Sequence, residues 1–233
     1  EPIIDYVADY TEHEFNNDDD AFIGFSDGDA TTRFQNGVQV DFEAGTWTES
    51  NMLLVDQSLR VLHHKLGTTE LLKPATGGAN FLRMHGKRID VDANTPAVIG
   101  WNIPGPTIGL TQNVFDLGTE WLAQTIFHEF AHNWDTIAEN STVDQFMALS
   151  GWTQTPQPDD THNEGTSTGE AWWYRNTATF ARDYGKLNPR EDFATAFAAY
   201  FMNETGQEYQ GGNGAADIPD KIAYLDGFFA DFA

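Results

Sequence analysis

Residues 120–137 of the chain are EWLAQTIFHEFAHNWDTI. Apolar side chains recur through this stretch at helical spacing, which predicts an α-helix. The stretch contains the pattern HExxH, from His128 to His132. Because an α-helix has 3.6 residues per turn, the two histidines project from one face, one turn apart. Two imidazoles in this arrangement can hold one zinc ion, and Glu129 is close enough to act as general base on a zinc-activated water.

A catalytic zinc site needs a third protein ligand and one open position. The metzincin pattern would have a glycine and a histidine where this chain has Asp135 and Ala138. The thermolysin-type pattern would have a glutamate about twenty residues after the second histidine, near Trp152, where the chain has no acidic residue. Residues 165–168 also lack the Gly-Thr-x-Asp signature of the aspzincins. The known local patterns therefore leave the third ligand open.

Four acidic residues farther along the chain remain as candidates for the third ligand: Glu164, Glu170, Glu191 and Asp192. Glu191 also has a purely structural interpretation. Asn188 is a good N-cap residue and Pro189 suits the first helical position, which makes Glu191 the third residue of a capping box. Both interpretations place Glu191 at the start of a helix.

The sequence around Glu191 resembles a known family, the gluzincin metallopeptidases of the anthrax lethal factor type and the related Pro-Pro endopeptidases. Their signature is HEFGH, then Tyr-Gly, then a glutamate that opens a helix rich in phenylalanine and alanine. Here HEFAH matches the first part, and Tyr184-Gly185 comes shortly before Glu191. The resemblance covers roughly residues 118–201. It implies that Glu191 is the third zinc ligand and that Tyr184 donates a hydrogen bond in the transition state.

One departure from the family concerns Thr195. The family often has glutamate at this position, where it can support the metal ligands, and threonine cannot supply that contact. The five remaining histidines have no ligand spacing, and we expect them to be surface residues or hydrogen-bonded ones. They are His13, His63, His64, His85 and His162.

The coarse pattern of the chain is α+β. In the first part we expect strands at 38–42, 81–84, 89–91, 97–101 and 107–111, a turn at 104–106 and one helix at 49–66. In the second part we expect helices at 119–138, 142–149, 171–183, 189–203 and 218–231, with a polar loop at 153–169. The resemblance implies a single zincin-like domain with two lobes, 1–117 containing a mixed β-sheet with a backing helix and 118–233 being helical. Either 97–101 or 107–111 would be the edge strand that aligns a peptide.

Composition restricts the partners. The 233 residues include 36 acidic and 12 basic ones, and the net charge of −24 argues against binding to nucleic acid or to an anionic membrane surface. No apolar run reaches the roughly 18 residues of a membrane span. The absence of cysteine excludes disulfides, thiol catalysis and cysteine-ligated zinc. We expect a processed, secreted or cell-surface monomer.

An acidic stretch near the start of the chain, residues 17–29, is either a solvated loop or a calcium site. Its aspartates are Asp18, Asp19, Asp20, Asp27 and Asp29. The stretch lacks the spacing and the closing glutamate of an EF-hand, which favours the solvated loop.

Taken together, these features predict a zinc metallopeptidase with one zinc ion per chain and a peptide or protein substrate. Two other classes share the same signals. One is a catalytically inactive zincin-fold module for binding or adhesion, against which the intact Glu129 argues. The other is a zinc hydrolase that acts on a non-peptide amide, since the same chemistry cleaves other amides.

Overall fold

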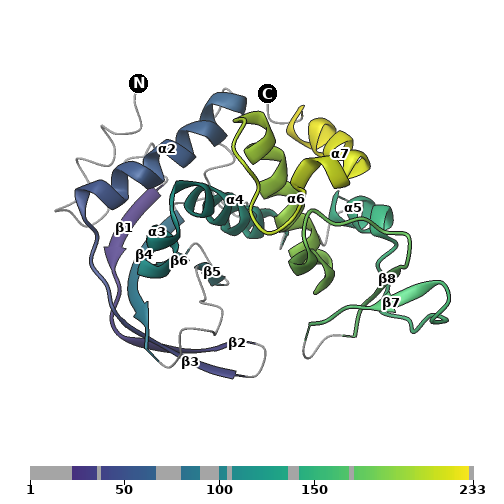
Figure 1. Ribbon diagram of the computed structural model, residues 1–233, viewed down its shortest axis with the longest axis horizontal. Coiled ribbons are helices and arrows are strands. Elements are labelled where there is room, and N and C mark those ends of the chain that lie inside the picture. The colour runs from purple at the N-terminus through teal and green to yellow at the C-terminus, as the bar shows by residue number, and fades with distance from the viewer. Residues whose placement is uncertain are drawn as a thin grey trace.

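The computed structural model describes residues 23–35, 38–66, 80–89, 100–103, 107–135, 142–167 and 171–230. Within them the chain is α+β, as predicted (Figure 1). The main strands are β1 (Ile23–Asp27), β2 (Thr31–Gln35), β3 (Val38–Ala44), β4 (Asn80–Arg88), β5 (Gly100–Ile103) and β6 (Thr107–Thr111). The helices are α2 (Glu49–Leu66), α3 (Gln112–Leu117), α4 (Thr119–Asp135), α5 (Thr142–Ser150), α6 (Pro189–Glu204) and α7 (Pro219–Ala230). Shorter elements are β7 (His162–Glu164), β8 (Trp173–Arg175) and the 3₁₀ helices η2 (Asp183–Lys186) and η3 (Gly214–Asp217).

The large sheet is mixed and is built around β4. On one side β4 pairs with β6 in parallel, and β6 pairs with β5 in antiparallel orientation. On the other side β1 runs parallel to the first half of β4, whereas β3 pairs antiparallel with its second half and carries β2 outside it. In the described part of the chain β5 is paired only with β6, so it is an edge strand.

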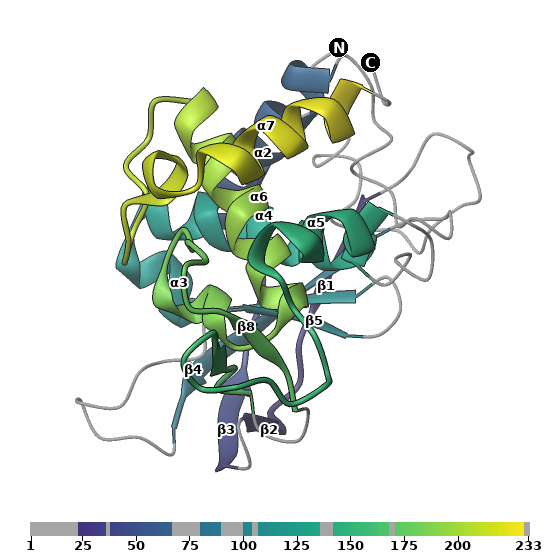
Figure 2. The ribbon, with the colours of Figure 1, turned by 90° about the vertical axis from the view of Figure 1, so that its right-hand side faces the viewer.

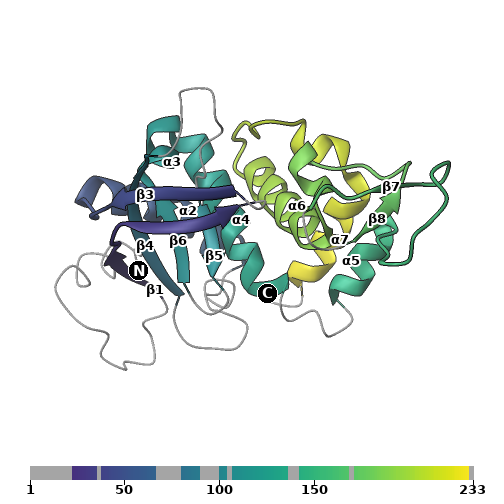
Figure 3. The same cartoon turned by 90° about the horizontal axis from the view of Figure 1, so that it is seen from below.

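The sheet curls so that strands far apart in its order come into contact. Phe42 of β3 and Trp101 of β5 are separated by β4 and β6, yet their ring centroids are 5.3 Å apart. Figure 3 shows β2 and β3 running across β4, β6 and β5. Val40, Phe42 and Trp101 form a small cluster inside this curl.

The opposite face of the sheet carries the main core. Leu82 of β4 and Ile108 of β6 are fully buried against α2 and α4, and the same core continues through α6 to α7. Helix α6 is buried on nearly all sides, which explains its apolar, alanine-rich sequence. Figure 1 places α4 between the sheet on the left and α5, α6 and α7 on the right, and Figure 2 views the molecule from the side of these three helices. None of the described helices has the length and apolar character needed to cross a membrane.

Several secondary-structure predictions are confirmed. Helix α2 has the predicted bounds, and α4, α5, α6 and α7 begin within one residue of their predicted starts. Strands β3, β4, β5 and β6 contain or overlap the predicted runs at 38–42, 81–84, 97–101 and 107–111. Residues 97–99, 104–106 and 136–138 lie outside the described residues.

Other predictions are wrong. The helix expected at 171–183 is instead strand β8 followed by turns and η2, because Tyr174 packs on Trp152 and Phe180 and so anchors an extended segment. The polar loop expected at 153–169 contains β7, the partner of β8. Ile89, the first residue of the strand predicted at 89–91, follows the end of β4 and is 58% exposed, and residues 90 and 91 lie outside the described residues. The end of the acidic stretch, expected to be a loop, forms β1 from Ile23, while residues 17–22 lie outside the described residues.

Candidate metal centre

Helix α4 brings the HExxH residues to one place. His128 and Glu129 are buried, with 9% and 5% of their surface exposed, and His132 is half-buried. The two imidazole rings are perpendicular, with centroids 4.8 Å apart, and their Nε2 atoms are 3.2 Å apart. The one-turn spacing therefore directs both Nε2 atoms to the same point, as the sequence predicted.

The start of α6 delivers the third residue. Asn188 caps the helix, with its side-chain oxygen accepting from the backbone N–H groups of Arg190 and Glu191, both at 3.0 Å. Pro189 is the first helical residue, as predicted. The carboxylate of Glu191 makes no return hydrogen bond to Asn188, so the capping-box interpretation of this side chain is not needed. It faces the two histidines instead.

The three side chains fit one metal ion. One Oε atom of Glu191 lies 3.0 Å from Nε2 of His128 and 3.7 Å from Nε2 of His132. In a tetrahedral site with bonds of about 2 Å, neighbouring ligand atoms would be ~3.3 Å apart. The two distances from the Glu191 oxygen to the histidine nitrogens lie on either side of that value. The same Oε atom is buried and forms no hydrogen bond of acceptable geometry. This oxygen is within ion-pair distance of both imidazoles but receives no well-aligned hydrogen bond, and a cation between the three groups would satisfy it.

Asp135 supports the metal-facing residues by contacting the far nitrogen of the His132 ring. It lies at the end of α4, and its carboxylate is 2.6 Å from Nδ1 of His132. Because a carboxylate only accepts, Nδ1 carries a proton, and Nε2 is the nitrogen that can bind a metal once it has lost its own proton. Sequence analysis considered Asp135 only as a departure from the metzincin pattern and missed this role. Its spacing of three residues after His132 was the available signal.

The charges of the group are coupled. Burial lowers the pKa of His128, although nearby Glu191 acts in the opposite direction. Burial also opposes protonation of His132, but the hydrogen bond that it donates to Asp135 and the nearness of Glu191 outweigh burial and raise the pKa of His132 well above the ordinary value. For Glu191, burial would raise the pKa, and the two histidines reverse this and hold it far below its usual range. Glu191 is therefore anionic, as a metal ligand requires.

Glu129 lies against the edge strand β5. A β-carbon at Gly100 would be 2.7 Å from Cγ2 of Thr125 and 3.2 Å from Oε1 of Glu129. Only glycine therefore allows β5 to approach α4 this closely. As a result, the backbone of the edge strand runs beside the carboxylate that the sequence predicts to be the general base.

Tyr184 lies on the other side of the histidines, in η2. Its ring centroid is 5.8 Å from that of His128, and the residue is 36% exposed. Burial and the carboxylates of Glu191 and Glu129 raise its pKa, so the phenol stays protonated and can donate a hydrogen bond. Gly185 lets η2 approach α6, since a β-carbon there would be 2.7 Å from Oγ1 of Thr195. This close approach gives the Tyr-Gly pair a physical reason.

Thr195 itself does not support the ligands. Its hydroxyl donates to the backbone carbonyls of Glu191 and Asp192, at 2.8 and 3.1 Å. As expected, Thr195 does not make the supporting contact of the family's glutamate, and Asp135 at the end of α4 supports His132 instead.

Asp192, the rival of Glu191 in sequence, faces away from the histidines. One of its oxygens is 2.5 Å from Nζ of Lys221, and the other accepts from Ser150 and Trp152. Lys221 also donates to the carbonyl of Thr179. Burial raises the pKa of Asp192 and lowers that of Lys221, so each needs the other to remain charged. This saturated carboxylate has a structural role.

The other candidates are separate from the site. Glu164 is exposed on β7, and Glu170 lies outside the described residues. Asp27 accepts from the backbone of Trp47, and Asp18, Asp19 and Asp20 are outside the described residues. Among the described residues, the only grouping of three or more possible ligands is His128, His132 and Glu191, so a calcium site has no support there.

Of the other histidines, His85 is buried and its Nδ1 is 3.1 Å from the carbonyl of Asp29. His162 bonds Thr161. Both were expected to be hydrogen-bonded or surface residues. His13 and the side chains of His63 and His64 lie outside the described part.

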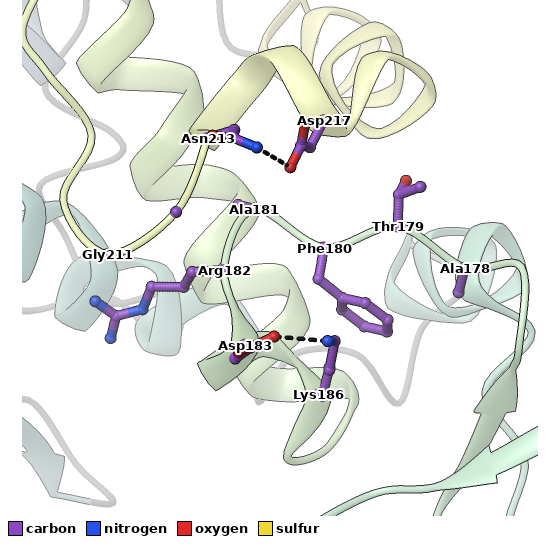
Figure 4. Close-up of a pocket in the computed structure, with 11 residues that line it drawn as sticks. Ala178, Thr179, Phe180, Ala181, Arg182, Asp183, Lys186, Gly211, Asn213 and Asp217 are labelled. Carbon is purple, nitrogen blue, oxygen red and sulfur yellow. Dashed lines mark hydrogen bonds and ion pairs between the residues drawn. The ribbon is translucent and has the colours of Figure 1, made fainter.

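A pocket of about 500 Å³ lies next to η2, between residues 178–183 and 211–217. Four of its polar side chains contact each other in two pairs, as Figure 4 shows. Asp183 forms an ion pair with Lys186 at 2.6 Å, and Asn213 donates a hydrogen bond to Asp217 at 2.9 Å. None of the three metal-facing residues lines it. The pocket and the metal-facing group are therefore separate features.

Comparison of the chain with protein-family models, with curated proteins and with solved structures gave no match.

Proposed function

We propose that the chain is a zinc-dependent endopeptidase with a zincin-like, two-lobed architecture of the kind its motifs resemble. The observation that carries the proposal is the buried oxygen of Glu191, which has no hydrogen bond and faces Nε2 of both HExxH histidines. Two histidines and one carboxylate are the ligand set of many catalytic zinc sites. The placement of α4 between the curled sheet and the helices α5 to α7 supports the two-lobed architecture.

The residues around the ligands supply the other parts of a peptidase. When bound, zinc would polarise the scissile carbonyl and lower the pKa of a bound water to about 7. Glu129 accepts the proton of the attacking water and passes it to the leaving amine. Tyr184 donates a hydrogen bond to the oxyanion as charge develops there. Asp135 fixes the ring of His132.

Strand β5 is the proposed guide for an extended peptide. Of the two runs considered from the sequence, β6 lies between β4 and β5, whereas β5 is at the edge of the sheet in the described part of the chain. Gly100 places the backbone of β5 next to Glu129. A peptide that pairs with the free edge of β5 would bring its backbone carbonyls past the general base, and backbone pairing of this kind recognises peptides rather than other amides.

The test is cleavage of a complex peptide mixture by the zinc-loaded protein, with products identified by mass spectrometry. We expect cleavage sites that share a consensus. The Glu129→Gln variant should keep its metal and fold but lose at least about 10²-fold in rate, because the amide cannot accept the proton.

Two results would count against the proposal. In one, the metal-loaded wild-type protein cleaves no peptide, which would favour a binding module. In the other, Glu129→Gln cleaves as fast as the wild type, which would remove the general base from the mechanism.

A further inference from the structure

Arg182 is a cation without a carboxylate partner beside the candidate metal centre. Its guanidinium lies over the ring of Tyr184, 5.0 Å from the centroid, and over the ring of Trp121 at 5.9 Å. Figure 4 shows its side chain pointing away from the Asp183–Lys186 pair. In the described part of the chain Arg182 forms no ion pair, and its Nε is buried without an acceptor.

Three other half-buried or buried cations have carboxylate partners, whereas Arg33 lies over the ring of Trp101 without one among the described residues. Lys186 pairs with Asp183, Lys221 with Asp192 and Arg60 with Asp56, all within 2.7 Å. Acidic residues outnumber basic ones by 36 to 12, so a partner for one more arginine would be easy to supply. Burying part of the charged guanidinium of Arg182, and its Nε–H group, without an acceptor costs free energy. A ligand that brings its own carboxylate would remove this cost.

The position of Arg182 places that ligand at the reacting groups. Trp121 precedes His128 by two helical turns and so lies on the same face of α4. The ring of Tyr184 is 5.8 Å from that of His128. Burial has the largest effect on both neighbours, lowering the pKa of His128 and raising that of Tyr184, and the charge of Arg182 is close enough to lower both pKa values by a smaller amount. Arg182, which also lines the pocket next to η2, is therefore separated from His128 by the ring of Tyr184.

We propose that Arg182 binds a carboxylate of the peptide substrate close to the bond that is cleaved. This inference rests on the proposed peptidase function and adds a substrate class to it. A guanidinium that lies over aromatic rings keeps the N–H groups on its edge available, and its planar fork binds a carboxylate through two parallel hydrogen bonds. The carboxylate comes from an aspartate or glutamate side chain or from the C-terminus of the peptide.

The experiment uses pairs of peptides built on a sequence that the protein cleaves. Glutamate and glutamine are exchanged at each position around the cleaved bond, and every peptide is made with a free and with an amidated C-terminus. At one position, or at the C-terminus, we expect the carboxylate to raise kcat/KM by about tenfold or more, as a charge-assisted hydrogen bond does. The amidated series separates the two sources.

The variant Arg182→Gln should lose this preference while it still cleaves the neutral peptides. Arg182→Lys, which keeps the charge but not the fork, should retain part of it and serves if Arg182→Gln does not fold. The matched control is Arg83→Gln, which changes the charge equally at an exposed position on β4 and should keep the wild-type preference.

If the wild type cleaves peptides without regard to carboxylates, or if both Arg182 variants keep the wild-type ratio, the inference is wrong and the proposed function stands. If the wild type cleaves nothing in the complex peptide mixture, the proposed function fails, and the role of Arg182 is tested by binding. For this purpose Kd is measured for peptides of arbitrary sequence that differ only by glutamate or glutamine, with Glu129→Gln and with the double variant Glu129→Gln/Arg182→Gln. A preference for glutamate that Arg182→Gln removes supports the inference, and equal Kd values overturn it.

Discussion

Two consecutive carboxylates at the start of α6 have opposite surroundings. Asp192 is fully buried and both of its oxygens are saturated, by Lys221 on one side and by Ser150 and Trp152 on the other. Glu191 faces the histidines of α4, and its buried oxygen lies within ion-pair distance of them but receives no well-aligned hydrogen bond. Asp192 therefore holds helices together, whereas Glu191 belongs to a group that could hold a metal ion, although the sequence presents the two as equal candidates.

The Asp192 side of this comparison should carry the largest stability effect. Replacing Asp192 by alanine leaves the ammonium of Lys221 buried and unpaired, so we expect a loss of about 3–5 kcal/mol in the free energy of unfolding. Urea denaturation followed by circular dichroism measures it. The double variant Asp192→Leu/Lys221→Met removes both charges and should lose much less. Equal losses of unfolding free energy in the single and double variants would mean that the unpaired charge of Lys221 does not cause the destabilisation.

On the Glu191 side, Tyr184 should affect the reaction and not the metal. Tyr184→Phe removes only the hydrogen-bond donor, so zinc content and stability should stay unchanged. We expect kcat to fall by roughly 10²-fold with little change in KM, because the bond forms in the transition state. Steady-state kinetics on a cleaved peptide tests this. A rise in KM at constant kcat would assign Tyr184 to substrate binding instead.

Asp135 should affect the metal through His132. Asp135→Asn keeps the size of the side chain but weakens the hold on Nδ1 of His132, and we expect metal affinity to fall about 10- to 100-fold. Competition with a fluorescent chelator measures the affinity. The control is Asp217→Asn, which changes a carboxylate paired with Asn213 outside the site. Equal affinities in the wild type and both variants would leave Asp135 without a role at the metal.

Asn188 caps the helix that carries both carboxylates, and its effect should be the smallest. Asn188→Ala removes the acceptor for the N–H groups of Arg190 and Glu191 and should cost about 1 kcal/mol of stability. Thermal unfolding measures it. Asn188→Ser, which can still cap, should recover most of the loss. If alanine and serine behave alike, the cap does not determine how α6 begins.

Local signals predicted the parts of the fold that local interactions determine. Helix α4 follows from its apolar spacing, and α6 follows from Asn188 and Pro189, because caps and periodicity act within one or two turns. Strand β8 was predicted as helix because an aromatic run fits both, and its packing on Trp152 depends on a segment about twenty residues earlier.

The candidate site also combines local features, which the sequence predicts, with long-range contacts, which it does not. The pair His128 and His132 is fixed by one turn of helix and could be predicted from the sequence alone. Glu191 could be named as a ligand only through a resemblance, since its contact with the histidines crosses about sixty residues. The pairing of Asp192 with Lys221 and the unpaired state of Arg182 are also long-range properties, and no sequence spacing encodes them.

The most direct test of the account is the metal content of three proteins: the wild type, Glu191→Ala and Glu164→Ala, each loaded with zinc, dialysed and analysed by native mass spectrometry. We predict one zinc per chain for the wild type and for Glu164→Ala, whose altered residue is exposed on β7. Glu191→Ala should lose the metal, because His128 and His132 alone provide only two ligands. Zinc retained at one equivalent in Glu191→Ala, or lost in Glu164→Ala, would contradict the assignment of the third ligand.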